Sequence, residues 1–292
     1  MPFITTNSVS LSGNSETVEI YYKDVGRGKP VILIHGWPLN HEMWEYQLNE
    51  LPKSNVRVIA YDRRGFGKSS RPWDGYDYDT FASDLRTLID ELDLNDVTLI
   101  GFSMGGGEVA RYLAKYNMDG RVKRAALIGS ITPFLLKTDN NPRGIPQEQF
   151  DAIKDELEDD RAKFLSAFGK TFYGVHTFNQ PVSNEFLQQN LSRCLNAALY
   201  ATVKSMQAWS TTDFRNDLTK IKVPLLVIHG REDETVPIGI SAEETAKQVP
   251  HAEYVVYDDA PHGLFYTHKN KFNEDLLTFI GGEKIIEFDY KA

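Results

Sequence analysis

Short apolar segments alternate with helical segments along this chain, and this alternation constrains the fold most. Seven segments have the apolar, β-branched or aromatic content of strands: 18–25 (VEIYYKDV), 31–35 (VILIH), 56–62 (VRVIAYD), 97–102 (VTLIGF), 125–130 (AALIGS), 225–230 (LLVIHG) and 252–259 (AEYVVYDD). From 31–35 onward they are almost continuously apolar, which is typical of parallel strands buried on both faces. The intervening segments, such as 78–93 and 105–116, have helical spacing and polar faces. Strands that alternate with helices predict a mostly parallel central sheet flanked by helices.

One long segment interrupts the alternation. Residues 131–217 contain no convincing strand, only helix-like stretches such as 147–173 and 184–209. A helical insertion after one strand would lie over the carboxyl edge of the sheet. We therefore predict an α/β core formed by residues 1–130 and 218–292, and a helical cap formed by residues 131–217.

The composition limits the partners and the compartment. A net charge of -9 disfavours a nucleic-acid or anionic-membrane surface. Cys194 is the only cysteine, so neither an intrachain disulfide nor a cysteine metal cluster can form. The first residues, MPFITTNSVS, lack the basic and apolar regions of a secretory signal, and no apolar stretch approaches the length of a membrane helix. We expect a cytoplasmic protein with no metal, cofactor, nucleic-acid or membrane partner.

A G-x-S-x-G motif, Gly101-Phe102-Ser103-Met104-Gly105, follows one predicted strand directly and opens a predicted helix. The sharp turn between them strains the central residue, and flanking glycines remove the Cβ clashes that would forbid it. The Ser103 hydroxyl would then lie above the sheet edge, with the Met104 N–H directed at a developing oxyanion. A glycine- and serine-rich turn without chemistry is the alternative. The position between strand and helix favours Ser103 as a nucleophile.

A serine nucleophile needs a base, and the base needs an orienting group. Of the seven histidines, His262 lies in a Pro/Gly loop just after the last predicted strand. That strand would deliver it to the carboxyl edge of the sheet. His268 is the weaker candidate, and we expect His35 and His229 to be structural.

The acid should follow the strand 225–230, where HGREDETVP contains Glu232, Asp233 and Glu234 in a row. The pattern H-G-x-x-D-x-x-V-P of this fold class selects Asp233, and Glu234 is the main alternative. The chain order Ser103, Asp233, His262 is that of the α/β-hydrolase triad.

A second oxyanion donor should follow the strand 31–35, where HGWPLN forms a glycine turn. In this turn the Trp37 N–H can face the Ser103 oxygen. Pro38 has no N–H and a fixed φ, so it stiffens the loop and restricts Trp37 to extended conformations.

These motifs, VILIHGWP, AYDRRGFGKSS, GFSMGGGEVARY, VIHGREDETVPI and APHGLFYTH among them, resemble those of the cofactor-free bacterial haloperoxidases. These enzymes are also called perhydrolases or non-haem chloroperoxidases, and they overlap with arylesterases. The resemblance covers roughly residues 2–279. It implies an α/β-hydrolase fold with a helical cap, a homo-oligomer that is trimer-based or a dimer, and no metal or haem. It also implies the site residues already derived: the triad Ser103, Asp233 and His262, and the backbone donors Trp37 and Met104. In the family, a proline at the position of Pro38 goes with perhydrolysis rather than plain hydrolysis.

We therefore expect acyl transfer through Ser103. A small carboxylic ester or acid would acylate it, and water or hydrogen peroxide would release the acid or a peracid, which oxidises halide downstream. The same triad would serve a lactonase, an amidase or a γ-lactamase. A hydrolase-fold protein that binds a small ligand without turnover is a further alternative. The cap shape decides the acyl group, and aromatic residues such as Phe134, Phe168 and Trp209 cannot be placed from the pattern.

Overall fold

A single sheet forms the centre of the computed structural model, which describes residues 2–9 and 15–281. Within these residues the sheet has eight strands in the order β1-β2-β4-β3-β5-β6-β7-β8. The strands are β1 Phe3–Val9, β2 Ser15–Gly26, β3 Lys29–Ile34, β4 Val56–Tyr61, β5 Val97–Phe102, β6 Val122–Ile128, β7 Leu225–Gly230 and β8 Glu253–Tyr257. Two neighbouring pairs, β1–β2 and β2–β4, are antiparallel, and all the other neighbouring pairs are parallel. The predicted mostly parallel sheet is confirmed.

All seven predicted strands are present. β5 and β7 have the predicted ends, and the ends of the other five differ from the prediction by up to three residues. The eighth, β1, has no counterpart among the predictions. Its inward residues Ile4 and Thr6 are buried, whereas Phe3 and Thr5 are exposed. Because one of the two inward residues is polar, the alternation that marks a half-buried strand is weak here.

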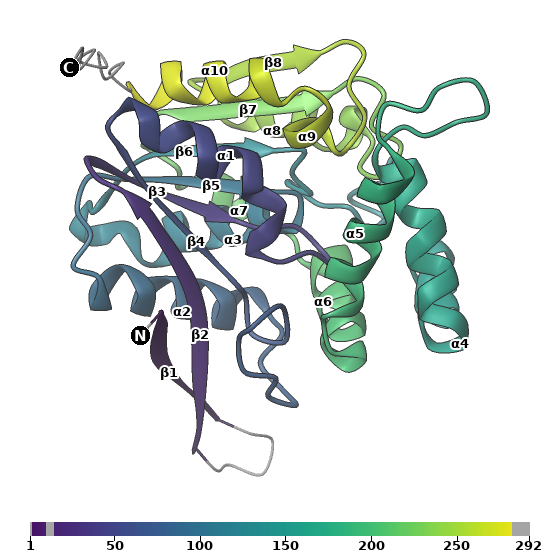
Figure 1. Ribbon diagram of the computed structural model, residues 1–292, viewed down its shortest axis with the longest axis horizontal. Coiled ribbons are helices and arrows are strands. Elements are labelled where there is room, and N and C mark those ends of the chain that lie inside the picture. Colours follow the sequence, from purple (N-terminus) through teal and green to yellow (C-terminus); the bar gives the residue numbers. More distant parts are fainter. Residues whose placement is uncertain (1, 10–14, 282–292) are drawn as a thin grey trace, which may run out of the picture.

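Helices cover both faces of the sheet (Figure 1). They are α1 Glu45–Glu50, α2 Tyr78–Glu91, α3 Met104–Lys115, α7 Arg215–Leu218, α8 Ala242–Gln248, α9 Leu264–Thr267 and α10 Lys269–Ile280. Helix α1 contacts α10, whereas α2 contacts α3, α3 contacts α7 and α7 contacts α8. Two separate helical layers therefore bury the apolar strands between them.

The segment between β6 and β7 is helical, as predicted. Besides α7 it contains α4 Gln147–Phe172, α5 Asn184–Leu195 and α6 Leu199–Thr211. Figure 1 shows α4, α5 and α6 together, beyond the carboxyl ends of the strands. The stretch 184–209 forms two helices, because α5 ends at Leu195 and the extended Ala198, whose N–H donates to Gly65 O at 3.0 Å, precedes α6.

Helix α4 also has a break, at Asp160, whose φ and ψ are -141° and 83°. The Asp160 carboxylate accepts from the Lys163 N–H at 3.0 Å and so caps the second half of the helix. No helix of residues 2–9 and 15–281 is long and apolar enough to cross a membrane. Residues 282–292, which we assigned to the core, lie outside the described residues.

Candidate active site

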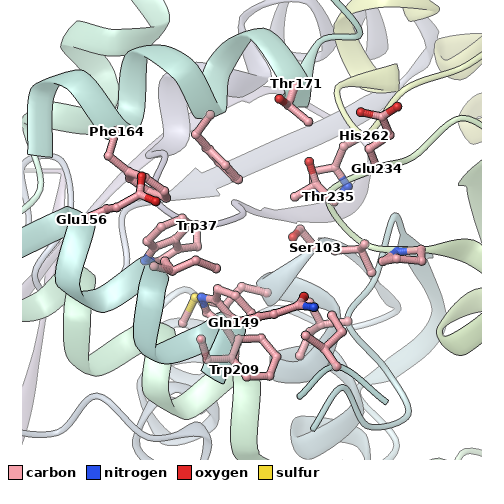
Figure 2. A pocket seen from close by; sticks show the side chains of 18 of the residues that line it. Trp37, Ser103, Gln149, Glu156, Phe164, Thr171, Trp209, Glu234, Thr235 and His262 are labelled. Atoms are coloured by element: carbon pink, nitrogen blue, oxygen red, sulfur yellow. The ribbon is translucent and has the colours of Figure 1, made fainter. Parts of the chain in front are cut away.

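A cavity of about 430 Å³ lies between the carboxyl ends of the strands and the helices beyond them. Trp37, Ser103, Met104 and His262 line it from the sheet side (Figure 2). These residues follow β3, β5 and β8, which are separate in sequence. The sheet topology thus brings four of the predicted site residues to one cavity.

Ser103 lies on a strained turn between β5 and α3. Its φ of 53° and ψ of -117° place a non-glycine residue in the left-handed half of conformational space. The Ser103 N–H donates to Ile128 O at 2.8 Å, and its carbonyl accepts from Gly106 N at 2.9 Å. A Cβ on Gly101 would lie 2.3 Å from Gly105 O, so strand and helix approach too closely for any side chain there. These contacts hold the backbone of Ser103 in a conformation that it would not adopt alone.

Asp233 and His262 form a buried pair. His262 Nδ1 lies 2.6 Å from Asp233 Oδ2, and neither side chain is more than 1% exposed. A carboxylate can only accept, so Nδ1 carries the proton and Nε2 is left as an acceptor. Within the described part of the chain, the buried Nε2 atom has no hydrogen-bond partner. It is therefore free to take a proton in the cavity.

The other Asp233 oxygen, Oδ1, accepts from the N–H groups of Thr235 at 2.9 Å and Val236 at 2.7 Å. Burial alone would raise the pKa of Asp233. The neighbouring imidazoles of His262 and His229 outweigh burial and hold the pKa well below its ordinary value. Asp233 is thus an ionised carboxylate that can orient His262. Glu234 lines the cavity instead, as an exposed residue.

His229 has a contact that the pattern did not predict. Its Nε2 atom lies 2.8 Å from Val236 O, as expected of a structural histidine, and also 3.1 Å from Asp233 Oδ2. Two imidazoles therefore share one carboxylate oxygen. The only available signal was the spacing of His229 and Asp233, four residues apart in HGRED.

The other histidines lie away from the reacting groups. His35 accepts from the Arg63 N–H at 3.0 Å through Nε2 and donates to Gly36 O through Nδ1. Burial and the Arg63 guanidinium lower the pKa of His35, so its ring is neutral at physiological pH. His268 contacts Asp259 at 3.1 Å and is not among the described residues that line the cavity.

The loop after β3 packs closely on the serine turn. A Cβ on Gly36 would lie 2.6 Å from the Phe102 ring and 3.2 Å from Ser103 Cβ. The Trp37 indole donates to Thr202 O on α6 at 2.9 Å, and the Trp37–Pro38 peptide bond is cis. Pro38 is buried and is not among the described cavity-lining residues. In the described part of the chain, neither the backbone N–H of Trp37 nor that of Met104 donates a hydrogen bond.

A buried ion pair links the two parts of the chain that contain the predicted backbone donors. Arg63 Nε binds Glu108 Oε2 at 2.7 Å, and Arg63 Nη2 donates to His35 O at 3.0 Å. Glu108 belongs to the helix that starts at Met104, and His35 precedes the loop that contains Trp37. Arg63 therefore holds these two parts of the chain together.

The far wall of the cavity is apolar and aromatic. Rings of Trp37 and Phe168 lie 5.5 Å apart, and those of Trp37 and Trp209 lie 5.7 Å apart. Phe134, which the pattern could not place, instead lies under Arg215 and does not line the cavity. The polar residues of this wall and of the rim are exposed: Gln149, Glu156, Thr171 and Glu234. The cavity thus has apolar walls and a polar mouth.

Comparison with known proteins identifies the class. Residues 29–269 match the alpha/beta hydrolase fold family, so the chain is an α/β hydrolase. A non-heme chloroperoxidase of Kitasatospora aureofaciens is 42% identical over 286 residues, which cover 96% of this chain and 99% of that protein. A bifunctional esterase/perhydrolase of Acinetobacter calcoaceticus is 38% identical and covers 90% of this chain and 96% of its own. The chain belongs to the non-haem haloperoxidase family of α/β hydrolases.

The fold comparison agrees with this family. The crystal structure of a bromoperoxidase from Bacillus anthracis superposes with a TM-score of 0.88 at 44% identity. The match covers 94% of this chain and all of the bromoperoxidase chain. An esterase from Exiguobacterium antarcticum superposes with a TM-score of 0.86 at 33% identity, over 96% of this chain and all of the esterase.

Proposed function

We propose that the protein is a serine acyl-transfer enzyme. It hydrolyses small carboxylic esters, and it forms peracids from a carboxylic acid or ester and hydrogen peroxide. The observation that carries the proposal is His262, which lines the same cavity as Ser103: its Nδ1 atom lies 2.6 Å from Asp233 Oδ2, and its Nε2 atom has no partner among the described residues. The names of the haloperoxidase and esterase/perhydrolase relatives support the same reaction.

The first half of the reaction acylates Ser103. Its hydroxyl oxygen attacks the substrate carbonyl while the proton passes to His262 Nε2, and Asp233 stabilises the resulting imidazolium. The oxyanion accepts from the N–H groups of Trp37 and Met104, each of which contributes about 3 kcal/mol to the barrier reduction. His262 then returns the proton to the leaving group.

The second half releases the acyl group. Water gives the acid and hydrogen peroxide gives the peracid, so halide oxidation is a later reaction of the released peracid. Pro38 would favour peroxide by turning the Trp37 carbonyl toward the cavity as an acceptor. In its support, that carbonyl accepts no hydrogen bond from the described residues. Pro38→Leu should lower the ratio of perhydrolysis to hydrolysis, and an unchanged ratio would remove Pro38 from the selection.

The helical cap, residues 131–217, selects the acyl group in this proposal. Phe150, Phe164 and Phe168 of α4 give the cavity an apolar wall, and the cavity volume of about 430 Å³ suits a small ester. No cavity-lining residue among those described specifically favours a lactone or an amide.

We also propose, from the family resemblance, that the protein is a cytoplasmic homo-oligomer, trimer-based or a dimer. Light scattering coupled to gel filtration measures the mass directly. A mass of 33.2 kDa, that of one chain, would reject the oligomer.

Ser103→Ala tests the central claim. We expect turnover of p-nitrophenyl acetate to fall by about three orders of magnitude or more, because a triad without its nucleophile retains little activity. A fluorophosphonate should label the wild-type protein once and leave the variant unlabelled. Retention of more than a few per cent of the turnover, at an unchanged melting temperature, would exclude Ser103 as the nucleophile. Steady-state turnover by the wild type would reject the alternative of a binding protein.

A further inference from the structure

The Thr235 hydroxyl has no role in the chemistry described so far. Thr235 lines the cavity together with Ser103 and His262. Its oxygen Oγ1 is buried and has no hydrogen-bond partner within the described part of the chain. Figure 2 shows Thr235 and His262 on the same side of the cavity, near Ser103. Buried hydroxyl groups in native proteins nearly always have a partner, so this one calls for an explanation.

One carboxylate fixes both Thr235 and the base. Asp233 Oδ1 accepts from the Thr235 N–H at 2.9 Å, and Oδ2 accepts from His262 Nδ1 at 2.6 Å. The next residue is also held, because the Val236 N–H donates to Oδ1 at 2.7 Å and Val236 O accepts from His229 at 2.8 Å. Thr235 is β-branched, so its χ1 angle is restricted as well. The Thr235 backbone and the His262 ring therefore keep a set position relative to each other.

Packing alone does not explain a hydroxyl at this position. A valine has the same shape and would fill the space without burying an unpaired polar atom. Thr171 offers a contrast, since it lines the same cavity but is exposed to solvent. Two residues that line a cavity with mostly apolar walls thus each have a buried polar atom without a partner among the described residues, Thr235 Oγ1 and His262 Nε2. A small molecule with two hydrogen-bonding atoms matches this pair.

We propose that Thr235 binds the second nucleophile, hydrogen peroxide, during release of the acyl group. This inference rests on the proposed function. One peroxide oxygen attacks the carbonyl carbon of the acyl-Ser103 ester, and its proton passes to His262 Nε2. The distal oxygen, which still carries its hydrogen, forms a hydrogen bond with the Thr235 hydroxyl. Collapse of the intermediate breaks the bond from carbon to Ser103 Oγ, and His262 returns the proton to that oxygen. The products are a peracid and free Ser103.

Water can contact His262 and Thr235 only through one oxygen, which must also attack the carbonyl carbon, whereas peroxide has a second oxygen for the contact with Thr235. A contact with Thr235 therefore favours peroxide over water without changing the first half of the reaction. Thr235 acts as a selectivity residue, and the prediction concerns the partition of the acyl-enzyme.

The test compares Thr235→Val, which removes the hydroxyl, with Thr235→Ser, which retains it. Thr171→Val is the matched control on the same cavity. The burst of p-nitrophenol reports acylation, and the ratio of peracid to acid over a range of peroxide concentrations reports the partition. We expect Thr235→Val to lower this ratio about three- to tenfold and to raise KM for peroxide, with acylation within about twofold of the wild type. Thr235→Ser should restore the ratio, and Thr171→Val should leave it unchanged.

Failure of this inference and failure of the proposed function give different results. If the wild-type enzyme produces no peracid, the perhydrolase function itself is wrong. If it does, and Thr235→Val leaves the ratio and KM for peroxide unchanged, only the role of Thr235 is overturned. A serine variant that behaves like the valine variant would assign the effect to packing of the threonine methyl group and would also overturn the inference.

Discussion

The two walls of the cavity are built differently. On the sheet side, Ser103, Asp233 and His262 are at most 6% exposed, and hydrogen bonds hold the serine backbone and the other two side chains. On the far side, Phe164 and Phe168 of α4 are only partly buried and are held by ring-to-ring contacts. A hydrogen bond has a narrow range of distance and angle, whereas aromatic rings pack in several arrangements. The strand ends therefore fix the proposed reacting atoms, and we expect Phe164 and Phe168 to change with little effect on them, whereas Phe172 at the end of α4 packs on His262.

The largest effect that this comparison predicts is for a substitution of Asp233, the acid of the proposed triad. Asp233→Asn keeps the shape but removes the charge that orients His262, and we expect kcat/KM for p-nitrophenyl acetate to fall about 10³- to 10⁴-fold. Glu234→Gln, on the next residue, should change it by no more than about threefold, because Glu234 is exposed. A larger loss in the Glu234 variant would reverse the assignment of the acid.

The second prediction compares a phenylalanine of the sheet, Phe102, with one of the cap, Phe168. Phe102 is fully buried beside His262, with ring centroids 4.8 Å apart, and also packs on Phe172 and Phe265. Phe102→Ala should lower the free energy of unfolding by about 3–5 kcal/mol. Phe168→Ala should lower it by only about 1–2 kcal/mol, since its ring is partly exposed.

Urea unfolding measures both values. Activity adds a second readout, because Phe168→Ala should shift the preference toward longer acyl groups while acetate turnover stays close to that of the wild type. Equal losses of stability would show that the two sides of the cavity are packed alike, contrary to this prediction.

The pattern of the sequence predicted the sheet side far better than the cap side. Strand content and the order of Ser103, Asp233 and His262 are local signals, and parallel topology carries their positions into space. Asp233 could be preferred to Glu234 only through a fold-class pattern. The spacing alone did not say which of three adjacent acids turns inward.

Contacts that depend on tertiary packing could not be predicted from the sequence. His229 was expected to be structural, and its contact with Asp233 arises because the loop after β7 folds back on the strand end. The break between α5 and α6 depends on a hydrogen bond from Ala198 to Gly65, about 130 residues away in the chain. The positions of Phe168 and Trp209 at the cavity could not be predicted either, because a helical pattern indicates which face of a helix is buried but not which element packs against it.

The third prediction uses pH to test the buried pair. The pKa of Asp233 is lower in the folded protein than in the unfolded chain, where an aspartate has a pKa of about 3.9. The ionised carboxylate therefore stabilises the fold at pH values above about 3.9, and this stabilisation is lost as the pH falls below that value toward the folded pKa. Between about pH 5 and pH 2, the free energy of unfolding of the wild type should fall relative to that of Asp233→Asn. Curves that remain parallel would show that Asp233 does not titrate differently on folding.

The smallest effect belongs to the rim of the cavity. Glu156 and Glu234 line the mouth as exposed carboxylates, and no lysine or arginine is among the described lining residues. Like charges about 8 Å apart repel by about 0.5 kcal/mol in water, which is roughly a twofold change in affinity. Glu156→Gln should therefore raise kcat/KM about twofold for an ester with an anionic acyl group, relative to a neutral ester of the same size.

Glu158→Gln is the matched control, because Glu158 is an exposed acid of the same helix outside the lining of the cavity. High salt should abolish the gain of the Glu156 variant, since screening shortens the reach of an exposed charge to about 3 Å at 1 M. A gain that persists at high salt, or that appears equally with the neutral ester, would point to shape rather than charge. The far wall would then select substrates by packing alone, whereas the opposite wall positions its residues by hydrogen bonds.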